Sequence, residues 1–300
     1  MGTFISIIIP LFNNQNKINK LLVNLKKINT SKIEIIFVDD CSTDRTYSIV
    51  KKRNLDEKKF FIYKTRKNLG PGIARNLGIK KSKSKYVMFL DSDDSLFINK
   101  LNKFLSFLSK KDFNICLFNK HEKKYFTTDK LKWTNNFFLE SFRREVIFGV
   151  YNRRFILNNK IKFKKGYYED IPFLYTLFLR NIKKILIYSY NIYKKSSSNN
   201  NSITKQLTET HIKNKINSWL YTFKIAKKNN INLNSRILNY RMRGELVNIY
   251  EKINFGKNMK KTKNIEHILV SHAKKYVNKS DKLVTKKDIK FLKYFKSENI

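Results

Sequence analysis

The sequence predicts an α/β fold, in which a mixed, mostly parallel sheet is flanked by helices and followed by a helical, basic C-terminal region. Three observations support this expectation. Short apolar runs alternate with segments of helical spacing over the first hundred residues, which is the βαβ pattern of a parallel sheet. Only 3 prolines and 8 glycines occur in 300 residues, which favours regular elements over long loops. From Thr204 onward the pattern is helical, polar and basic.

The first predicted strand covers residues 4–9, a continuous apolar run of the kind that is buried on both faces of a sheet. Pro10–Asn14 is expected to end it. Lys17–Ile28 carries its apolar residues at helical spacing, which predicts a helix. The same alternation continues through a strand at 33–38, a helix at 46–53, a strand at 60–63, a helix at 73–82 and a strand at 86–90.

The second half of the chain is less regular. Its predicted elements are a helix at 100–108, a strand at 115–118, a helix at 173–179 and a strand at 185–193. A polar, low-complexity loop follows at 196–202. We therefore expect one domain over residues 1–203 and a separate helical region over residues 204–300.

The formal net charge is +41, from 64 lysines and arginines against 23 acidic residues. A field this positive attracts anions such as nucleic acid, acidic lipid headgroups or phosphorylated substrates. We favour a second explanation of the charge, a compositional bias, because lysine, asparagine and isoleucine are abundant throughout the chain. Lysine is scattered and lacks the clustering with arginine and aromatic residues that nucleic-acid-binding surfaces show. We expect no specific nucleic-acid partner, and attraction to an anionic membrane surface as a consequence of the charge.

The sequence carries no sign of a membrane span or of export. It has no run of 18 apolar residues, and its N-terminus lacks the basic flank and cleavage site of a signal peptide. Its two cysteines, Cys41 and Cys116, form neither a metal-binding spacing nor a disulfide framework. We expect a cytoplasmic protein, with a peripheral position at the inner face of the plasma membrane as the alternative that its charge allows.

Three of the predicted strands end in polar loops, which are Pro10–Asn13, Asp39–Asp44 and Asp91–Asp94. Ligands of parallel sheets bind beyond the carboxyl ends of the strands, so these loops together indicate a binding site. No G-x-G-x-x-G follows the first strand and no P-loop motif occurs, which disfavours dinucleotide-binding and P-loop proteins.

The segment Asp91-Ser92-Asp93-Asp94 places three carboxylates within four residues after a buried strand. Carboxylates this close repel one another unless a cation lies among them. A polar turn that caps the next helix would explain the same residues. The neighbouring polar loops favour the cation site over the turn.

Four segments occur in the order and spacing that is typical of one enzyme family: Ile5–Asn13, Ile35–Asp44, Asn68–Asn76 and Phe89–Asp94. Together they resemble the family 2 glycosyltransferases of the GT-A fold, of the bacterial surface-polysaccharide type. The resemblance is close over about residues 4–100, and residues 1–100 are expected to bind the nucleotide sugar. A weaker resemblance runs from the Tyr151–Phe173 segment to Asn201–Ile203, within residues 101–203, which are expected to face the acceptor. The last hundred residues resemble no family.

The resemblance implies a nucleotide-sugar donor, UDP-linked in most members, and a divalent ion, Mn²⁺ or Mg²⁺, that bridges its diphosphate. Pro10 and Phe12 would form a wall against the base, with Asn13 also at the donor. Asp40 would accept a hydrogen bond from uracil, with Asp39 beside it.

The resemblance also implies the residues around the diphosphate. Arg75 would lie near the nucleotide. Asp91 and Asp93 match the DxD motif of the family, the first near the ribose and the metal ion and the second on the metal ion, with Ser92 between them at the donor. Carboxylate oxygens are the ligands that these hard ions prefer.

Family members with a similar second half use the aspartate of a Glu-Asp pair as general base, which implies Asp170 as base and Glu169 as its support or as a contact to the acceptor. An acceptor hydroxyl needs such a base because its own pKa lies far above 7. The alternative is that the pair only favours the helix that follows it, through the helix dipole or a cap. Lys194, Lys195, Ser198 and Ser202 could hold the diphosphate or belong to a solvated linker.

We expect an inverting, metal-dependent glycosyltransferase. It would move a sugar from a UDP-sugar to a hydroxyl of a free or lipid-linked cell-surface glycan, such as capsule, lipooligosaccharide or a teichoic-type polymer. The alternative is a non-catalytic protein that binds sugar nucleotides, polyanions or a membrane surface. Clustered carboxylates argue against this alternative, because they contribute nothing to binding a polyanion.

Overall fold

The computed structural model describes residues 4–28, 31–56, 59–108, 111–118, 137, 145–196, 208–231, 241–249 and 271. The chain divides into two compact units. The first consists of residues 1–126 and 143–198, and the second of residues 127–142 and 199–300. The domain division expected after residue 203 stays a prediction. Among the described residues, no helix has the length and apolar character needed to cross a membrane.

The first unit is built on a sheet in the order β3-β2-β1-β4-β7-β6-β8. Its strands are β1 (Ile5–Leu11), β2 (Ile33–Asp39), β3 (Phe60–Lys64), β4 (Tyr86–Phe89), β6 (Ile115–Phe118), β7 (Gly149–Asn152) and β8 (Ile185–Tyr188). Neighbouring strands are parallel, except that β7 is antiparallel to both β4 and β6. This confirms the predicted mixed, mostly parallel sheet.

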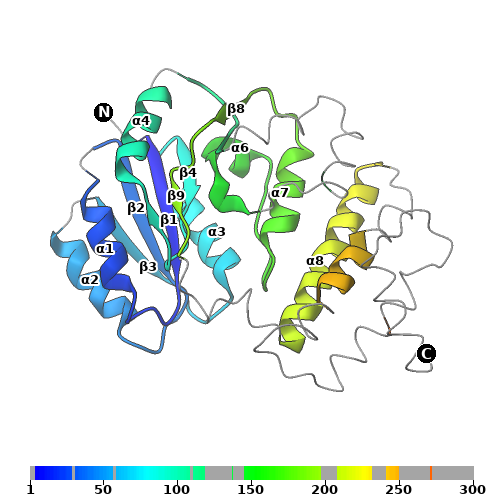
Figure 1. Ribbon diagram of the computed structural model, residues 1–300, viewed down its shortest axis with the longest axis horizontal. Coiled ribbons are helices and arrows are strands. Elements are labelled where there is room, and N and C mark those ends of the chain that lie inside the picture. The colour runs from blue at the N-terminus through cyan, green and yellow to red at the C-terminus, as the bar shows by residue number, and fades with distance from the viewer. Residues whose placement is uncertain are drawn as a thin grey trace. The chain divides into compact units, whose positions relative to one another are not determined.

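Helices cover both faces of this sheet. Its helices are α1 (Ile18–Lys26), α2 (Thr46–Asp56), α3 (Pro71–Lys81), α4 (Ile98–Leu108), α6 (Arg153–Asn158) and α7 (Asp170–Phe178). Figure 1 shows α1 and α2 together on one side of the strands and α3 on the other. The chain moves from β1 towards β3 and then returns past β1 to β4. Crossovers between parallel strands are right-handed as a rule, so this reversal of direction accounts for helices on opposite faces.

The central strands β1 and β2 are buried along their whole length, as their continuous apolar sequences predict. The expected end of the first strand before Pro10 is wrong, because β1 continues through Leu11. The Leu11 carbonyl oxygen accepts from the Asp40 N–H on the β2 side, so the nitrogen of Pro10 faces the β4 side. Pairing with β4 has already ended there at Ile8, so the missing N–H of proline is tolerated.

Two short strands form a second sheet that the sequence did not predict. β5 (Ser95–Leu96) pairs antiparallel with β9 (Tyr193–Lys194), and Leu96 lies opposite Tyr193. The single strand expected at 185–193 is therefore wrong, because the chain leaves the main sheet after Tyr188. This second sheet holds residues 193–194, which come after β8, beside residues 95–96, which come after β4.

A buried carboxylate ties together the amino-terminal edge of the main sheet. Oε1 of Glu34 accepts hydrogen bonds from the hydroxyls of Ser6 and Ser84, at 2.5 and 3.0 Å, and from the Lys83 N–H at 2.9 Å. Glu34 is thus satisfied within the fold, at the edge opposite to the polar loops.

The described part of the second unit is helical, as predicted, and contains α8 (Glu209–Lys228) and a helical segment at 241–249. Trp219 of α8 is buried, and its indole N–H donates to Glu245 at 3.2 Å. Burial works against the charged form of Glu245, but Lys215 and Arg241 outweigh it and lower the pKa of Glu245 to about 2. A buried ion network therefore joins these two helical segments.

Candidate active site

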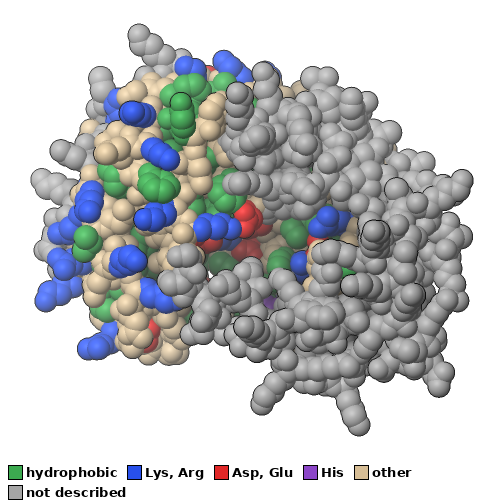
Figure 2. Space-filling view, viewed as in Figure 1, with side chains coloured by type: hydrophobic (Ala, Val, Ile, Leu, Met, Phe, Trp, Pro, Cys, Tyr) green, Lys and Arg blue, Asp and Glu red, His purple; other side chains and the backbone are tan. Residues whose placement is uncertain are grey.

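The polar loops gather at the carboxyl-terminal edge of the main sheet. β1, β2 and β4 are parallel neighbours, so the segments that follow Leu11, Asp39 and Phe89 leave the sheet at the same edge. On the face drawn in Figure 2, basic side chains are spread widely, whereas the largest group of acidic side chains lies in one place. The topology confirms that the three loops lie at one edge of the sheet, and a binding site there stays a prediction.

The guanidinium of Arg75 joins three carboxylates from distant parts of the chain. Nη2 donates to Asp91 Oδ1 at 2.8 Å. Nη1 donates to Glu169 Oε1 at 2.5 Å and to Asp170 Oδ1 at 3.2 Å. The side chains of Arg75 and Glu169 are only 5% and 7% exposed, so water screens the interaction between them weakly. Arg75 therefore links the loop after β4 directly to the Glu-Asp pair.

Two features bring Arg75 to this position. The first turn of α3 begins at Pro71 and is preceded by Gly70, whose φ of 91° is a conformation that glycine adopts readily. The guanidinium then lies over the ring of Phe163, with Cζ 5.5 Å from its centroid. Phe163 stacks on Phe173 at 3.8 Å, so an aromatic layer excludes water beneath the ion cluster.

Three members of the ion cluster, Arg75, Glu169 and Asp170, have shifted pKa values. Burial disfavours the charged form of Arg75, but Asp170, Asp91 and Glu169 outweigh it and raise the pKa of Arg75 further. Burial raises the pKa of Asp170 to about 8, against the opposing effect of Arg75 and with added repulsion from Glu169 and Asp91. Burial also raises the pKa of Glu169. One cation among three crowded carboxylates thus favours retention of a proton on the Glu-Asp pair.

Asp170 faces the ion cluster rather than its own helix. Its Oδ2 accepts from the N–H of Val146 at 3.1 Å, while Oδ1 accepts from Arg75. The helix predicted to start at Phe173 begins at Asp170 instead, and the preceding Glu169 makes no side-chain cap. The carboxylate of Asp170 is 19% exposed, so one part of it remains open to solvent. The bonds to Arg75 and Val146 favour a role in the site over a role as a helix cap.

The four residues Asp91–Asp94 take different positions. Asp91 is 38% exposed beside Arg75, and Ser92 and Asp93 are partly exposed. Asp94 is bound on both oxygens, because Oδ2 accepts from the Tyr193 hydroxyl at 2.6 Å and Oδ1 from the Ser196 N–H at 2.6 Å. The acidic segment therefore presents Asp91 and Asp93, while Asp94 is held by residues 193–196.

Asp91 and Asp93 fit a divalent ion that a substrate helps to bind. Among the described residues, no three His, Cys, Asp or Glu side chains are arranged to hold a metal ion by themselves. Mg²⁺ and similar hard ions are often bound by one or two carboxylates together with substrate phosphates. Two partly exposed carboxylates, Asp91 and Asp93, match the protein's share of that donor set.

The loop after β2 is hydrogen-bonded to the loop after β1. The Asn13 N–H donates to the Ser42 hydroxyl at 3.0 Å, and Asn13 Oδ1 accepts from the Thr43 N–H at 2.9 Å. Asn13 has a φ of 51°, a left-handed conformation that asparagine tolerates. Phe12 beside it is 44% exposed, whereas Pro10 is buried inside β1. Of the expected base wall, Phe12 offers the open apolar surface.

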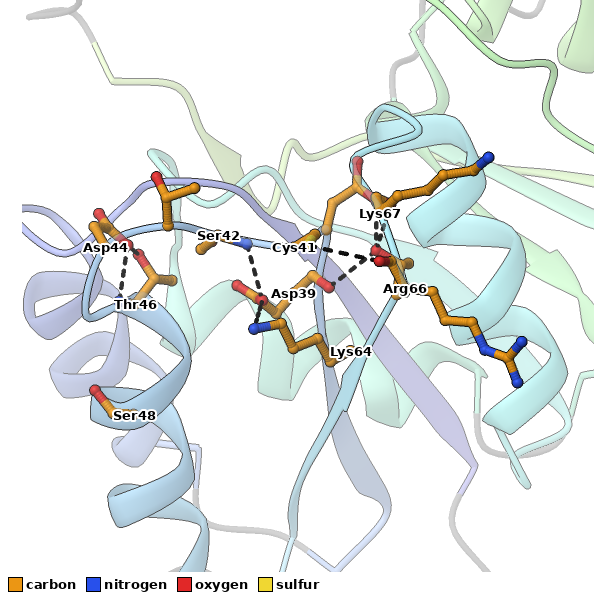
Figure 3. A network of polar contacts seen from close by, with 12 residues as sticks. Asp39, Cys41, Ser42, Asp44, Thr46, Ser48, Lys64, Arg66 and Lys67 are labelled. Carbon is orange, nitrogen blue, oxygen red and sulfur yellow. Dashed lines mark hydrogen bonds and ion pairs between the residues drawn. The ribbon is translucent and has the colours of Figure 1, made fainter.

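Asp39 and Asp40 differ sharply in their partners. Both oxygens of Asp40 accept bonds, Oδ2 from the N–H groups of Leu69 and Gly70 at 3.0 and 2.6 Å, and Oδ1 from the Thr65 hydroxyl at 2.9 Å. Asp39 Oδ2 accepts from the Ser42 N–H at 3.1 Å and lies 3.9 Å from Lys64 Nζ, as Figure 3 shows. Its Oδ1 is buried and has no hydrogen-bond partner among the described residues.

Of the residues expected as a diphosphate contact or linker, two are described. Lys195 pairs with Glu145, and its ammonium lies 5.3 Å from the centroid of the Phe148 ring. Lys194 lies over the ring of Phe97, 5.8 Å from its centroid. Ser198 and Ser202 lie outside the described residues. Lys195 comes near the ion cluster, because Glu145 directly precedes Val146.

Two contributors to this site were not identified from the sequence. Tyr193 binds the acidic segment through its hydroxyl, and Val146 binds Asp170 through its backbone N–H. A backbone donor leaves no signature in residue types. Tyr193 stands in a predicted strand among several other tyrosines, so nothing in the sequence distinguished it.

The model of glycosyl transferase family 2 matches residues 6–181, which is more than half of the chain. The chain belongs to glycosyl transferase family 2. Arg75 and the carboxylates that it binds all lie within the matched range; these carboxylates are Asp91, Glu169 and Asp170. The mixed, mostly parallel sheet flanked by helices confirms the GT-A fold that the sequence predicted, and the solved structures described below share it.

Relatives of this family 2 glycosyltransferase extend the similarity. An uncharacterised glycosyltransferase of Haemophilus influenzae is 28% identical over 193 residues, which cover 62% of this chain and 76% of that protein. The poly(ribitol-phosphate) beta-N-acetylglucosaminyltransferase TarS of Staphylococcus aureus is 42% identical over 98 residues, which cover 32% of this chain and 17% of TarS. The match thus spans a small part of the longer relative.

Solved structures of two enzymes share the fold. TarS residues 1–349, solved with UDP-GlcNAc, superpose with a TM-score of 0.67 at 20% identity, covering 99% of this chain and 88% of that one. The mannosyltransferase PcManGT of Pyrobaculum calidifontis, solved with GDP-Man and Mn²⁺, gives a TM-score of 0.55 at 12% identity, covering 100% and 87% of the two chains. At these identities the similarity establishes the fold.

Proposed function

We propose that this family 2 glycosyltransferase transfers a sugar from a UDP-sugar to a hydroxyl of a cell-surface polymer, with inversion at the anomeric carbon. The observation that carries the proposal is the Arg75 bridge between Asp91 and Asp170. Through this one guanidinium, the carboxylate that we assign to the metal–diphosphate group is joined to the carboxylate that we assign as general base. A single displacement needs these two groups near each other, on opposite sides of the reacting carbon.

In this proposal Asp91 and Asp93 hold Mn²⁺ or Mg²⁺ together with the donor diphosphate. The bound ion would act as a Lewis acid that neutralises the charge developing on the leaving diphosphate. Arg75 keeps Asp91 in place through the bond at 2.8 Å and adds a positive charge beside the leaving group. The partial exposure of Asp91 supports this assignment, because the carboxylate remains accessible to a ligand.

Asp170 serves as the general base. Its carboxylate is fixed by Arg75 and by the Val146 N–H, and burial raises its pKa towards neutrality, where a base is most effective. It would accept the proton of the acceptor hydroxyl while that oxygen bonds to the sugar carbon and the diphosphate leaves. Glu169 supports it by binding the same guanidinium nitrogen.

We assign recognition of the uracil base to Asp39 rather than to Asp40. Asp40 already uses both oxygens to hold Thr65, Leu69 and Gly70, whereas Asp39 keeps a buried oxygen without a partner. A buried acceptor that lacks a donor costs stability unless a ligand supplies one, and the N3–H of uracil is such a donor. Phe12 would stack on the base through its exposed ring.

The names of two relatives guide the choice of acceptor. TarS is named for transfer of N-acetylglucosamine to poly(ribitol-phosphate), and TuaG of Bacillus subtilis, 34% identical over 108 residues, for teichuronic acid biosynthesis. A polyanionic surface polymer would also suit a chain with a net charge of +41. We therefore propose a polymer of this type as acceptor and N-acetylglucosamine as the first donor sugar to test.

A panel of UDP-sugars tests the proposal directly. The purified protein should hydrolyse one of them slowly in the presence of Mn²⁺, and excess EDTA should abolish this turnover. Asp93→Ala should abolish it as well, and Asp170→Asn should abolish transfer to the acceptor. NMR of the product should show the anomeric configuration opposite to that of the donor. Full activity in EDTA would contradict the metal role, and absence of turnover with every donor would contradict enzymatic activity towards UDP-sugars.

A further inference from the structure

The residues Asp91–Asp94 form a turn, which we call the carboxylate turn. The Asp94 N–H donates to the Asp91 carbonyl oxygen at 3.1 Å and closes it. Both carboxylates that we assign to the metal ion lie in this turn. Their separation and direction therefore depend on what holds the turn, which follows a strand of only four residues.

The hydroxyl of Tyr193 binds the carboxylate turn at both ends. It accepts a hydrogen bond from the Asp91 N–H at 3.0 Å and donates one to Asp94 Oδ2 at 2.6 Å. The other oxygen of Asp94 accepts from the Ser196 N–H at 2.6 Å. Asp94 is thus engaged by residues 193–196, and the hydroxyl of Tyr193 spans the turn from its first residue to its last.

Tyr193 itself is held by packing that does not involve the turn. Its side chain is 1% exposed, its ring lies 5.9 Å from that of Phe148, and its backbone pairs with Leu96 in the second sheet. A side chain that is buried and packed in this way can impose a position on the backbone that it binds. The turn lies between β4 on one side and the β5–β9 pair on the other.

We infer that Tyr193 is a positioning residue that sets the metal-binding geometry of Asp91 and Asp93. The inference rests on the proposed function. Asp91 is fixed twice, at its N–H by Tyr193 and at its carboxylate by Arg75, and only the first contact also reaches Asp94. Groups that orient metal ligands from outside the coordination shell typically change metal affinity by about 10- to 100-fold when removed. Tyr193 acts in this way through the backbone of the turn.

Tyr193→Phe tests the inference, because it removes the hydroxyl and keeps the buried ring. We expect Mn²⁺ titrated into the UDP-saturated protein to bind about 10- to 100-fold more weakly than in the wild type, measured by calorimetry. The Mn²⁺ concentration for half-maximal turnover should rise in parallel, while kcat at saturating Mn²⁺ changes much less. A tyrosine that only filled the core would lower the melting temperature and leave the Mn²⁺ affinity of the folded protein unchanged.

Tyr188→Phe is the matched control. Tyr188 is also buried, at the end of β8, but its ring packs on Phe104 and Phe107. The Tyr188→Phe substitution should leave Mn²⁺ binding unchanged. If Tyr193→Phe does not fold, Asp94→Ala removes the other partner of the hydrogen bond and should weaken Mn²⁺ binding in the same direction.

Two results would overturn the inference in distinguishable ways. Wild-type affinity for Mn²⁺ in folded Tyr193→Phe, or in folded Asp94→Ala, contradicts the role of Tyr193 and leaves the proposed function intact. A wild-type protein that binds no Mn²⁺ in the presence of UDP contradicts the proposed function, and the inference with it.

Discussion

Gly72 and Glu169 pack against each other so closely that a Cβ atom on Gly72 would lie 2.7 Å from Glu169 Cγ. The same atom would lie 2.8 Å from the carbonyl oxygen of Lys164, which belongs to the backbone and cannot rotate away. Glycine at this position lets the first turn of α3 approach the segment that carries the Glu-Asp pair. Arg75, three residues later, is thereby brought within reach of Glu169 and Asp170.

Gly72→Ala should therefore damage both stability and activity. Alanine normally stabilises a helix relative to glycine, but here its methyl group must displace Glu169 or the backbone at Lys164. We expect a loss of about 1–3 kcal/mol in the free energy of unfolding, typical of overpacking, and at least a tenfold loss of turnover. Chemical denaturation and the UDP-sugar assay measure these two effects.

Gly244→Ala is the control for this substitution. Gly244 lies in the helical segment 241–249, and a Cβ atom there would meet nothing within 4 Å. The substitution should raise stability by about 0.5–1 kcal/mol through helix propensity and leave turnover unchanged. Equal behaviour of the two alanine variants would contradict the close-approach argument for Gly72.

Arg75→Lys should abolish most of the activity although it keeps the charge. An ammonium cannot reproduce the fork in which Nη2 binds Asp91 while Nη1 binds Glu169 and Asp170. We expect kcat/KM for the UDP-sugar to fall by about 100-fold or more, because the preorganised hydrogen-bond donors of the guanidinium beside the developing charge are lost. Arg53→Lys, at an exposed position of α2, should change it less than twofold. Near-wild-type activity of Arg75→Lys would mean that the bridge contributes only charge.

The strands that carry the polar loops could be predicted from the sequence because each combines an apolar run with a polar end that is local to it, whereas the roles of the site residues stay predictions. Strand ends such as Val38-Asp39 and Leu90-Asp91 combine an apolar run with carboxylates that the next residues cannot neutralise. The Arg75 bridge could not be predicted in the same way, since Glu169 is 94 residues away along the chain. Only the folded backbone determines that α3 and the start of α7 meet over Phe163.

Two differences between the predicted and the observed elements also have causes in the tertiary structure or the local sequence: β7 was not predicted, and α7 begins before the predicted helix. β7 is four residues long and contains a glycine, so it has no clear period, and its antiparallel pairing with β4 and β6 comes from tertiary contacts. α7 begins at Asp170 although the apolar pattern starts at Ile171 and contains Pro172, because proline is tolerated in a first helical turn. The partners of Asp39 and Asp40 also depend on the third dimension, since adjacent carboxylates look alike in a sequence.

The raised pKa of Asp170 should appear in the pH dependence of the reaction. A general base must be deprotonated, so kcat/KM should rise with pH through the pKa of Asp170, which burial raises from 3.8 to about 8. Glu169→Gln removes a negative charge that helps to raise the pKa of Asp170, so the acidic limb of the pH profile should move to lower pH. Asp170→Asn should abolish transfer at every pH. A limb near pH 4 in the wild type would contradict Asp170 as a buried base.

The same pKa shift predicts a pH dependence of stability. The folded protein binds the Asp170 proton more tightly than the unfolded chain, so this carboxyl lowers the free energy of unfolding as the pH rises from 3.8 through about 8. Asp170→Asn should flatten this part of the stability profile. Thermal melting of both proteins across this range measures the difference, and identical slopes would contradict the assignment.

Asp39 and Asp40 should respond differently to the same substitution by asparagine. Asp39→Asn replaces the free acceptor oxygen with an amide that can also donate, so it should weaken UDP binding by about tenfold or more while the fold is kept. Its amide can donate to N3 of cytosine, which carries no hydrogen, so the ratio of UDP to CDP affinity should fall.

Asp40→Asn removes an acceptor from Leu69, Gly70 or Thr65 and should lower the melting temperature without changing the ratio of UDP to CDP affinity. Competition of UDP and CDP against a fluorescent nucleotide measures the ratio for each variant. A change of the ratio in Asp40→Asn alone would return base recognition to Asp40, because selectivity between the two bases depends on the carboxylate that contacts N3.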